Sequence, residues 1–256
     1  MVSRKTIAAV SYLNTIPFIY GISHGDQNLC AEFLLSPPSG CTSAFSSNQC
    51  DIALVPVAAI PTLNNKRILS RFCIGASGKV RSVALLSNTP LDKISKIYLD
   101  PHSQSSVLLV RILASKHWNI EPTWLPITDF ETINPSDKES AWVLIGDKVF
   151  DYEDKFEYNY DLAHQWQQMT GLPFTFAVWV ANKDVDQQYT HLLEQSLEYG
   201  IGNIPAALAC SRFADKQYAL DYLSNNIDYI FDEQKKAAME LFWEEGMRIK
   251  PLINPG

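Results

Sequence analysis

Short apolar runs of strand length alternate with helical patterns along this chain, and no other feature constrains its fold as strongly. Alternation of this kind predicts an α/β fold. The strand-like runs include KTIAAVSYL, CDIALV and TGLPFTFAVWVAN, in which most side chains are apolar. The clearest helix starts in PHSQSSVLLVRIL, where Ser105 or Ser106 is expected to cap an apolar helical body.

The order of these elements predicts two lobes. Lobe one is expected to hold residues 1–87 together with the mainly helical residues 179–256, and lobe two to hold residues 88–178. The chain would cross between them near Ser87–Pro90 and again near Ala177–Asn182. Folds of this type bind ligands in the cleft between the lobes, at the carboxyl ends of the strands. A ligand cleft is therefore expected in that place.

Charge and hydropathy argue against several kinds of partner. The chain has a formal net charge of −7 and no run of Lys and Arg, so no nucleic acid partner is expected. No stretch approaches about 18 consecutive apolar residues, so no membrane-spanning helix is expected. The start MVSRKTIAAVSYLN lacks the long apolar stretch and cleavage site of a secretory signal. These features predict a cytoplasmic protein and leave its oligomeric state open.

Signatures of common cofactors are missing from the sequence. There is no GxGxxG, GxxxxGKS/T or GxSxG pattern, and the five histidines form no HExxH pair. The five cysteines include no CxxC and no zinc-like spacing, which is typical of reduced thiols in a reducing compartment. We therefore expect neither a nucleotide cofactor nor a catalytic metal.

Polar side chains gather instead at the ends of predicted strands. Each group also has a purely structural interpretation: serines before a helix often only cap it, Asp147 could cap the next helix, and Ser82 could be packed inside an apolar strand. The groups are Ser11–Tyr12–Asn14–Thr15, Ser82 with Ser87, Asp100–His102–Ser103–Ser105–Ser106, Gly146–Asp147 and Thr170–Gly171–Leu172–Pro173.

The serine-rich start of the strong helix is the most specific of these groups. A helix N-terminus exposes unpaired N–H groups and carries roughly half a positive charge, so it can hold a carboxylate without Lys or Arg. The segment SQSS adds hydroxyl donors at that point. A net-acidic chain could thus bind a small carboxylate ligand, as a solute-binding module or as an enzyme.

Several of these segments together resemble the chorismate dehydratases of the futalosine route to menaquinone. The resemblance covers nearly the whole chain to about residue 182 and follows the family's order of motifs. The combination of YLNT-x-P and TGLPF-x-FA-W is specific, whereas DIALVP alone would be weak. The segments are VSYLNTIPF, DIALVPVAAI, RSVALLS, LDPHSQSSVLLVRIL, LIGDKVF, DLAHQW and TGLPFTFAVWV.

The resemblance implies a fold like that of type II periplasmic binding proteins, with the ligand in the cleft between two lobes. It also implies an enzyme that removes water from chorismate to give 3-enolpyruvylbenzoate without a cofactor. One alternative is the dihydroxynaphthoate synthase of the same pathway, whose Thr-rich HTIPG-like segment is not found here. Another is a non-catalytic protein that binds a small carboxylate on the same fold.

Site residues follow from the matching motifs, except Ser39, which lies in the loosely matching region PPSGCTSAFSSNQC. Asn14 is expected to be the catalytic group, hydrogen-bonded to the departing hydroxyl or to the carboxylate that acts as base. A Ser stands where the family has Thr in the Thr-Ser pair before the helix, and this exchange keeps a hydroxyl. No motif contains an obvious His or Glu base, so the substrate's own enolpyruvyl carboxylate could remove the proton. The expected substrate-binding residues are Ser11, Tyr12, Ser39, Ser82, Ser103, Ser105, Ser106, Gly146, Asp147, Thr170 and Gly171.

Overall fold

The computed structural model describes residues 4–26 and 29–250. Contacts between residues divide the chain into two compact units. Unit 1 consists of Met1–Ala76 and Thr175–Asp232, and unit 2 of Ser77–Phe174 and Glu233–Gly256. In the described residues each unit is built on one mixed sheet, which confirms the predicted α/β class.

The sheet of unit 1 has six strands in the order β11-β4-β10-β3-β1-β2. Strand β1 runs parallel to β2 and β3, while β10 is antiparallel to β3 and β11 to β4. Every residue of β3 and β10 is buried, as their continuous apolar sequences predict for strands covered on both faces. The strands are β1 (Lys5–Val10), β2 (Ala31–Ser36), β3 (Ile52–Pro56), β4 (Arg67–Ala76), β10 (Phe174–Ala181) and β11 (Asp228–Ile230).

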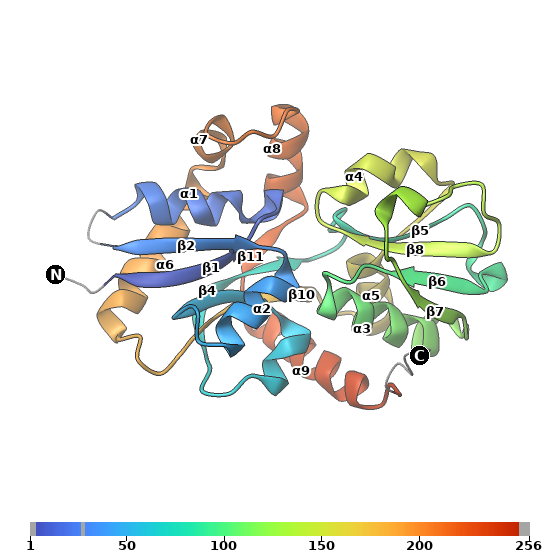
Figure 1. Ribbon diagram of the computed structural model, residues 1–256, viewed down its shortest axis with the longest axis horizontal. Helices are drawn as coiled ribbons and strands as arrows, with labels where there is room; N and C mark the ends of the chain where they lie inside the picture. The colour runs from blue at the N-terminus through green and yellow to red at the C-terminus, as the bar shows by residue number, and fades with distance from the viewer. Residues whose placement is uncertain (1–3, 27–28, 251–256) are drawn as a thin grey trace. The chain divides into compact units, whose positions relative to one another are not determined.

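Helices α1 and α6 of unit 1 lie side by side, although they are far apart in the chain (Figure 1). Phe18 of α1 meets the rings of Trp179 and Tyr229 edge-on, with centroids 5.6 and 5.2 Å away. This packing anchors α1 directly after the polar turn that follows β1. The helices are α1 (Ile16–His24), α2 (Pro38–Ser46), α6 (Gln187–Gly202), α7 (Ile204–Ala209) and α8 (Lys216–Asn225), with 3-10 turns η1 (Leu13–Thr15) and η2 (Val57–Thr62).

The sheet of unit 2 has five strands in the order β7-β6-β8-β5-β9. Strand β6 is parallel to β7 and β8, whereas β5 is antiparallel to β8 and β9. The strands are β5 (Val83–Ser87), β6 (Lys96–Leu99), β7 (Thr123–Pro126), β8 (Ser140–Ile145) and β9 (Tyr158–Asp161).

Helix α9 packs on unit 2. The ring of Phe242 meets those of Trp166 and Phe174 edge-on, with centroids 6.1 and 5.2 Å away. Further along α9, Gly246 lies against Leu108 of α3. The helices of unit 2 are α3 (Gln104–Leu113) with the π-helical turn η4 (Ala114–Trp118), α4 (Lys148–Tyr152), α5 (Leu162–Thr170) and α9 (Glu233–Met247), with 3-10 turns η3 (Leu91–Lys93), η5 (Phe130–Thr132) and η6 (Glu153–Lys155).

This division differs from the expected one in three places. Residues 175–178 were expected in lobe two and belong to unit 1, because β10 pairs with β3. Residues 77–87 belong to unit 2, because β5 pairs with β8 and β9 and therefore cannot leave that sheet. Residues 233–256 were expected in lobe one and instead fall in unit 2, because Phe242 fills an aromatic cluster there. None of the helices in the described ranges is both long and apolar enough to cross a membrane.

Candidate functional site

The polar segment after β1 is a turn held by its buried residues. Leu13 and Thr15 are buried within η1, while Ser11 is exposed and Tyr12 and Asn14 are half-buried. The backbone N–H of Ser11 donates to the carbonyl of Ser36 at 3.1 Å, which extends the pairing of β1 with β2. The alternation of buried and less buried residues leaves the Asn14 side chain accessible at a fixed point of unit 1.

Asn14 is oriented by two hydrogen bonds. Its Oδ1 accepts from the Thr15 hydroxyl at 3.1 Å, and its main-chain carbonyl accepts from the Tyr229 hydroxyl at 3.0 Å. Burial raises the pKa of Tyr229 well above its ordinary value, so the phenol stays protonated and can donate. No partner for the Asn14 Nδ2 is found among the described residues, which leaves this N–H₂ group as a donor for a ligand.

Ser39 lies in the first turn of α2 and does not cap it. The helix follows Pro37, and no side chain caps its first N–H groups. Proline at the first helical position explains the start without a side-chain cap, because its fixed φ suits that position. The hydroxyls of Thr42 and Ser43 instead donate back to the carbonyls of Pro38 and Ser39.

The N-cap of α3 is Ser103, which corrects the expectation that Ser105 or Ser106 would be the cap. The Ser103 hydroxyl oxygen accepts the N–H of Ser106 at 3.1 Å, the usual bond from the N-cap to the third helical residue. Ser105 and Ser106 lie inside the first turn and are buried together with Ser103. The three serines therefore surround the N-terminal turn of α3.

Ser82 and Gly146 are brought together by the pairing of β5 with β8. The carbonyl of Ser82 accepts the N–H of Gly146 at 2.8 Å. Ser82 precedes β5 and does not lie inside the strand, which corrects the expectation from its apolar neighbours. Gly146 has a φ of 65°, a left-handed conformation that glycine adopts without strain.

A residue that the sequence analysis missed, Asp161, holds the loop before Ser82. Its two carboxylate oxygens accept the backbone N–H groups of Arg81 at 2.6 Å and His164 at 3.0 Å. Arg81 has a φ of 63°, so this bond supports an unfavourable backbone conformation next to a predicted site residue. Burial raises the pKa of Asp161, against the opposing effect of the bonds from His164 and Arg81.

Replacing Asp161 with asparagine should lower the free energy of unfolding by about 1–3 kcal/mol. An asparagine side chain has one acceptor oxygen, so the N–H of Arg81 or of His164 would face an N–H₂ group. Thermal unfolding measures the change, and Asp186→Asn is the control because Asp186 caps α6 with a single bond from Tyr189. Asparagine is as good an N-cap as aspartate. Equal losses in the two variants would contradict the role assigned to Asp161.

Asp147 occupies the position before α4 without capping it. Its side chain makes no cap hydrogen bond with α4, so the interpretation of Asp147 as a helix cap is wrong. Asp147 stays a predicted substrate contact next to the Gly146 turn.

Thr170 and Gly171 end helix α5. The Thr170 hydroxyl donates to the carbonyl of Trp166 at 2.9 Å and accepts the N–H of Leu172 at 3.1 Å. Gly171 has a φ of 76°, as is common for glycine just after a helix. The TGLPF motif thus joins α5 to β10, and both residues have a structural role at this junction.

The buried cysteines Cys41 and Cys50 are poor nucleophiles. Burial is the main cause that raises the pKa of Cys41 to about 12 and of Cys50 to about 11, so neither is a ready thiolate. In residues 4–26 and 29–250 no three His, Cys, Asp or Glu side chains are placed to hold a metal ion. A cavity of about 500 Å³ in unit 2 contains none of the predicted site residues; its lining includes Arg111, Trp124 and Arg248.

A family model described as menaquinone biosynthesis matches residues 5–247 of the chain. Among solved structures, protein AF1704 from Archaeoglobus fulgidus is 18% identical, with a TM-score of 0.76 over 96% of this chain and 97% of that chain.

Two further solved structures show the same architecture. The CA3427 gene product of Candida albicans, described as having the generic periplasmic binding protein fold, is 13% identical, with a TM-score of 0.67 over 99% of this chain and 93% of that one. The ligand-binding component of an ABC-type import system from Staphylococcus aureus, with zinc bound, is 10% identical, with a TM-score of 0.68 over 98% and 94%. This likeness confirms the predicted periplasmic-binding-protein-like fold.

Proposed function

The chain belongs to the menaquinone biosynthesis family, and from this premise we propose that it is a hydro-lyase that converts chorismate to 3-enolpyruvylbenzoate and water. The observation that carries the proposal is the family match over residues 5–247, together with the intact YLNT-x-P and TGLPF-x-FA-W motifs. We further propose that the enzyme is cytoplasmic, in keeping with its five free thiols.

The proposed reaction balances without an external oxidant or reductant. One ring C–H bond and the neighbouring C–OH bond break, the C–H electron pair becomes a ring double bond, and the hydroxyl leaves as water. The product ring is aromatic, which makes the reaction strongly favourable. The barrier lies in removing a proton from a carbon that only the conjugated ring carboxylate activates.

Unit 2 is proposed to bind a substrate carboxylate. The buried hydroxyls of Ser82, Ser105 and Ser106 and the N-terminus of α3 supply donors, and Ser103 fixes that turn by capping it. Hydrogen bonds to the ring carboxylate stabilise the negative charge that is delocalised into it as the proton leaves. Such stabilisation needs neither Lys nor Arg in direct contact with the substrate.

Unit 1 is proposed to supply Asn14 as the catalytic group. Its free N–H₂ would donate to the departing hydroxyl or to the substrate carboxylate that takes the proton. The enolpyruvyl carboxylate is our proposed base, because a well-oriented intramolecular group reaches an effective molarity of about 10⁵–10⁸ M. Further proposed contacts are Ser11, Tyr12, Ser39, Gly146, Asp147, Thr170 and Gly171.

Incubating the pure protein with chorismate tests this proposal. We expect the aromatic enolpyruvyl product to accumulate with the stoichiometric loss of chorismate, followed by absorbance and chromatography. Binding without turnover, measured by calorimetry, would indicate a non-catalytic carboxylate-binding protein. The absence of both binding and turnover would favour the dihydroxynaphthoate synthase or another lyase and would reject the dehydratase.

A further inference from the structure

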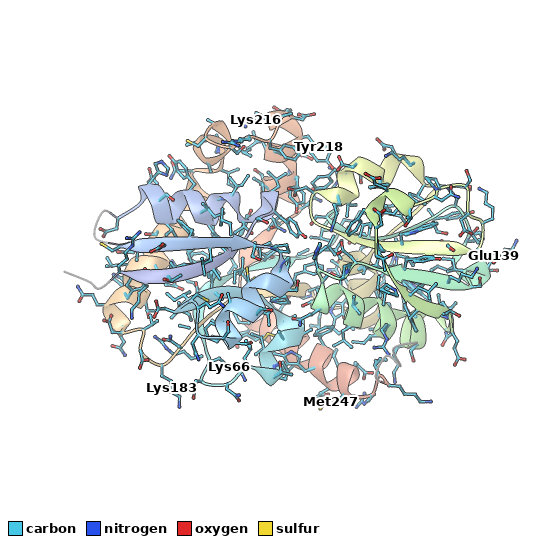
Figure 2. All side chains as sticks on the ribbon, in the orientation of Figure 1. Lys66, Glu139, Lys183, Lys216, Tyr218 and Met247 are labelled. Carbon is cyan, nitrogen blue, oxygen red and sulfur yellow. The ribbon has the colours of Figure 1, made fainter. Side chains whose placement is uncertain are left out.

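A fully buried carboxylate lies just before the serine-rich turn of α3. Asp100 follows β6, its Oδ1 accepts the N–H of His102 at 3.0 Å, and its carbonyl accepts the N–H of Ser103 at 3.3 Å. Asp100 therefore braces the turn that places the N-cap of α3. The charged side chains of Glu139 and Lys183, by contrast, are exposed and point outward from their units (Figure 2).

Lys148 is the cation that faces this carboxylate. Its Nζ lies 2.6 Å from Oδ2 of Asp100, and the Lys148 side chain is only 24% exposed. Among the described residues Oδ2 has no hydrogen bond, so it depends on this ion pair for compensation. Lys148 is the first residue of α4, directly after the Gly146–Asp147 turn.

Aromatic and histidine side chains fix the ammonium in place. Nζ lies 4.0 Å from the centroid of the Phe130 ring, a cation–π contact, and 3.4 Å from Nδ1 of His102. The His102 ring stacks on Phe130, and its Nδ1 lies 3.5 Å from Oδ1 of Asp100. The lysine is thus held over one carboxylate by partners on two other segments of unit 2, the loop that contains Asp100 and His102 and the turn that contains Phe130.

We propose that Lys148 is a positioning residue whose charge cancels that of Asp100, so that the carboxylate can brace the turn before α3 without repelling a substrate carboxylate at this helix. This inference rests on the proposed function, since it assumes that an anion binds at the serine-rich turn. A buried negative charge without compensation would act strongly on a nearby anion, because the low dielectric of the interior screens it poorly.

Lys148→Met should therefore raise KM for chorismate by about tenfold to a hundredfold and change kcat much less. Lys148→Arg should restore most of the affinity because it keeps the charge. The double variant Asp100→Asn/Lys148→Met should also return KM towards the wild-type value, since it removes both charges. If Lys148 only supported the local packing, the double variant, which still lacks the lysine side chain, would not recover the wild-type KM.

The control is Lys155→Met, which removes an exposed lysine 4.3 Å above the Tyr152 ring in the same unit and should leave KM unchanged. Circular dichroism and thermal unfolding check that each variant is folded. If Lys148→Met alone does not fold, KM is measured in the double variant, because that variant leaves no unpaired Asp100 charge buried.

The inference is overturned if folded Lys148→Met keeps the wild-type KM, or if the double variant binds chorismate as weakly as the single one. These outcomes differ from a failure of the proposed function, which would show as an absence of chorismate binding and turnover in the wild-type protein itself. Calorimetry with chorismate measures affinity directly and separates the two cases even where turnover is slow.

Discussion

Asn14→Ala should lower kcat for chorismate dehydration by about 10²- to 10³-fold while the chain stays folded. The substitution removes the Nδ2 donor that we assign to the departing hydroxyl or the acting carboxylate. It keeps the main-chain carbonyl that accepts from Tyr229, so the turn after β1 should hold its shape. Steady-state kinetics and thermal unfolding together separate the loss of catalysis from a loss of folding.

Two further variants sharpen this test. Asn14→Asp keeps the size of the side chain but replaces the donor by a carboxylate, so we expect it to be at least as inactive as the alanine variant. Asn225→Ala removes an exposed amide of unit 1, which donates to Asp221 in the preceding turn of α8, and should retain full activity. Wild-type kcat in Asn14→Ala would remove this residue from the mechanism.

The buried strands could be predicted because a strand that is buried on both faces has a nearly continuous apolar sequence. CDIALV and FTFAVWVA are nearly all apolar, and β3 and β10 are buried along their whole length. The order of strands and helices along the chain likewise predicted the α/β class. The buried strands and the α/β class depend on the local pattern of apolar residues, which can be read from a single sequence.

Short polar elements could not be recognised in the same way. Strand β9 has the sequence YNYD at the edge of its sheet, where only one neighbour holds it, and its apolar pattern is too brief to identify. Strand β11 has three residues and is also an edge strand. Such strands form because a partner strand offers hydrogen bonds, and that partner is distant in the sequence.

The candidate site was predictable in its residue types but not in its contacts. The segment HSQSS offers several serines as caps, and only the position of the Ser106 N–H identifies Ser103 as the N-cap. The hydrogen bond from Arg81 to Asp161 and the ion pair of Lys148 with Asp100 join residues that are far apart in the chain. Contacts of this kind come from tertiary packing, which leaves no local pattern.

The second large effect is expected at the crossing of α1 and α6. Gly200→Ala should lower the free energy of unfolding by about 2–4 kcal/mol, because a Cβ there would lie 1.9 Å from the carbonyl oxygen of Pro17 and 2.9 Å from the backbone nitrogen of Gly21. Both contacts are with backbone atoms, so no side chain can rotate away and the two helices must separate. Thermal and denaturant unfolding would measure the loss.

Gly202→Ala is the matched control, since Gly202 ends the same helix and a Cβ there would meet nothing within 4 Å. That variant should be neutral or more stable by up to about 1 kcal/mol, as alanine favours helix over glycine. Equal stability of the two variants would mean that the α1–α6 backbones do not meet this closely in solution. Because α1 begins two residues after Asn14, a large loss confined to Gly200→Ala would show that the close α1–α6 crossing stabilises the helix next to this turn.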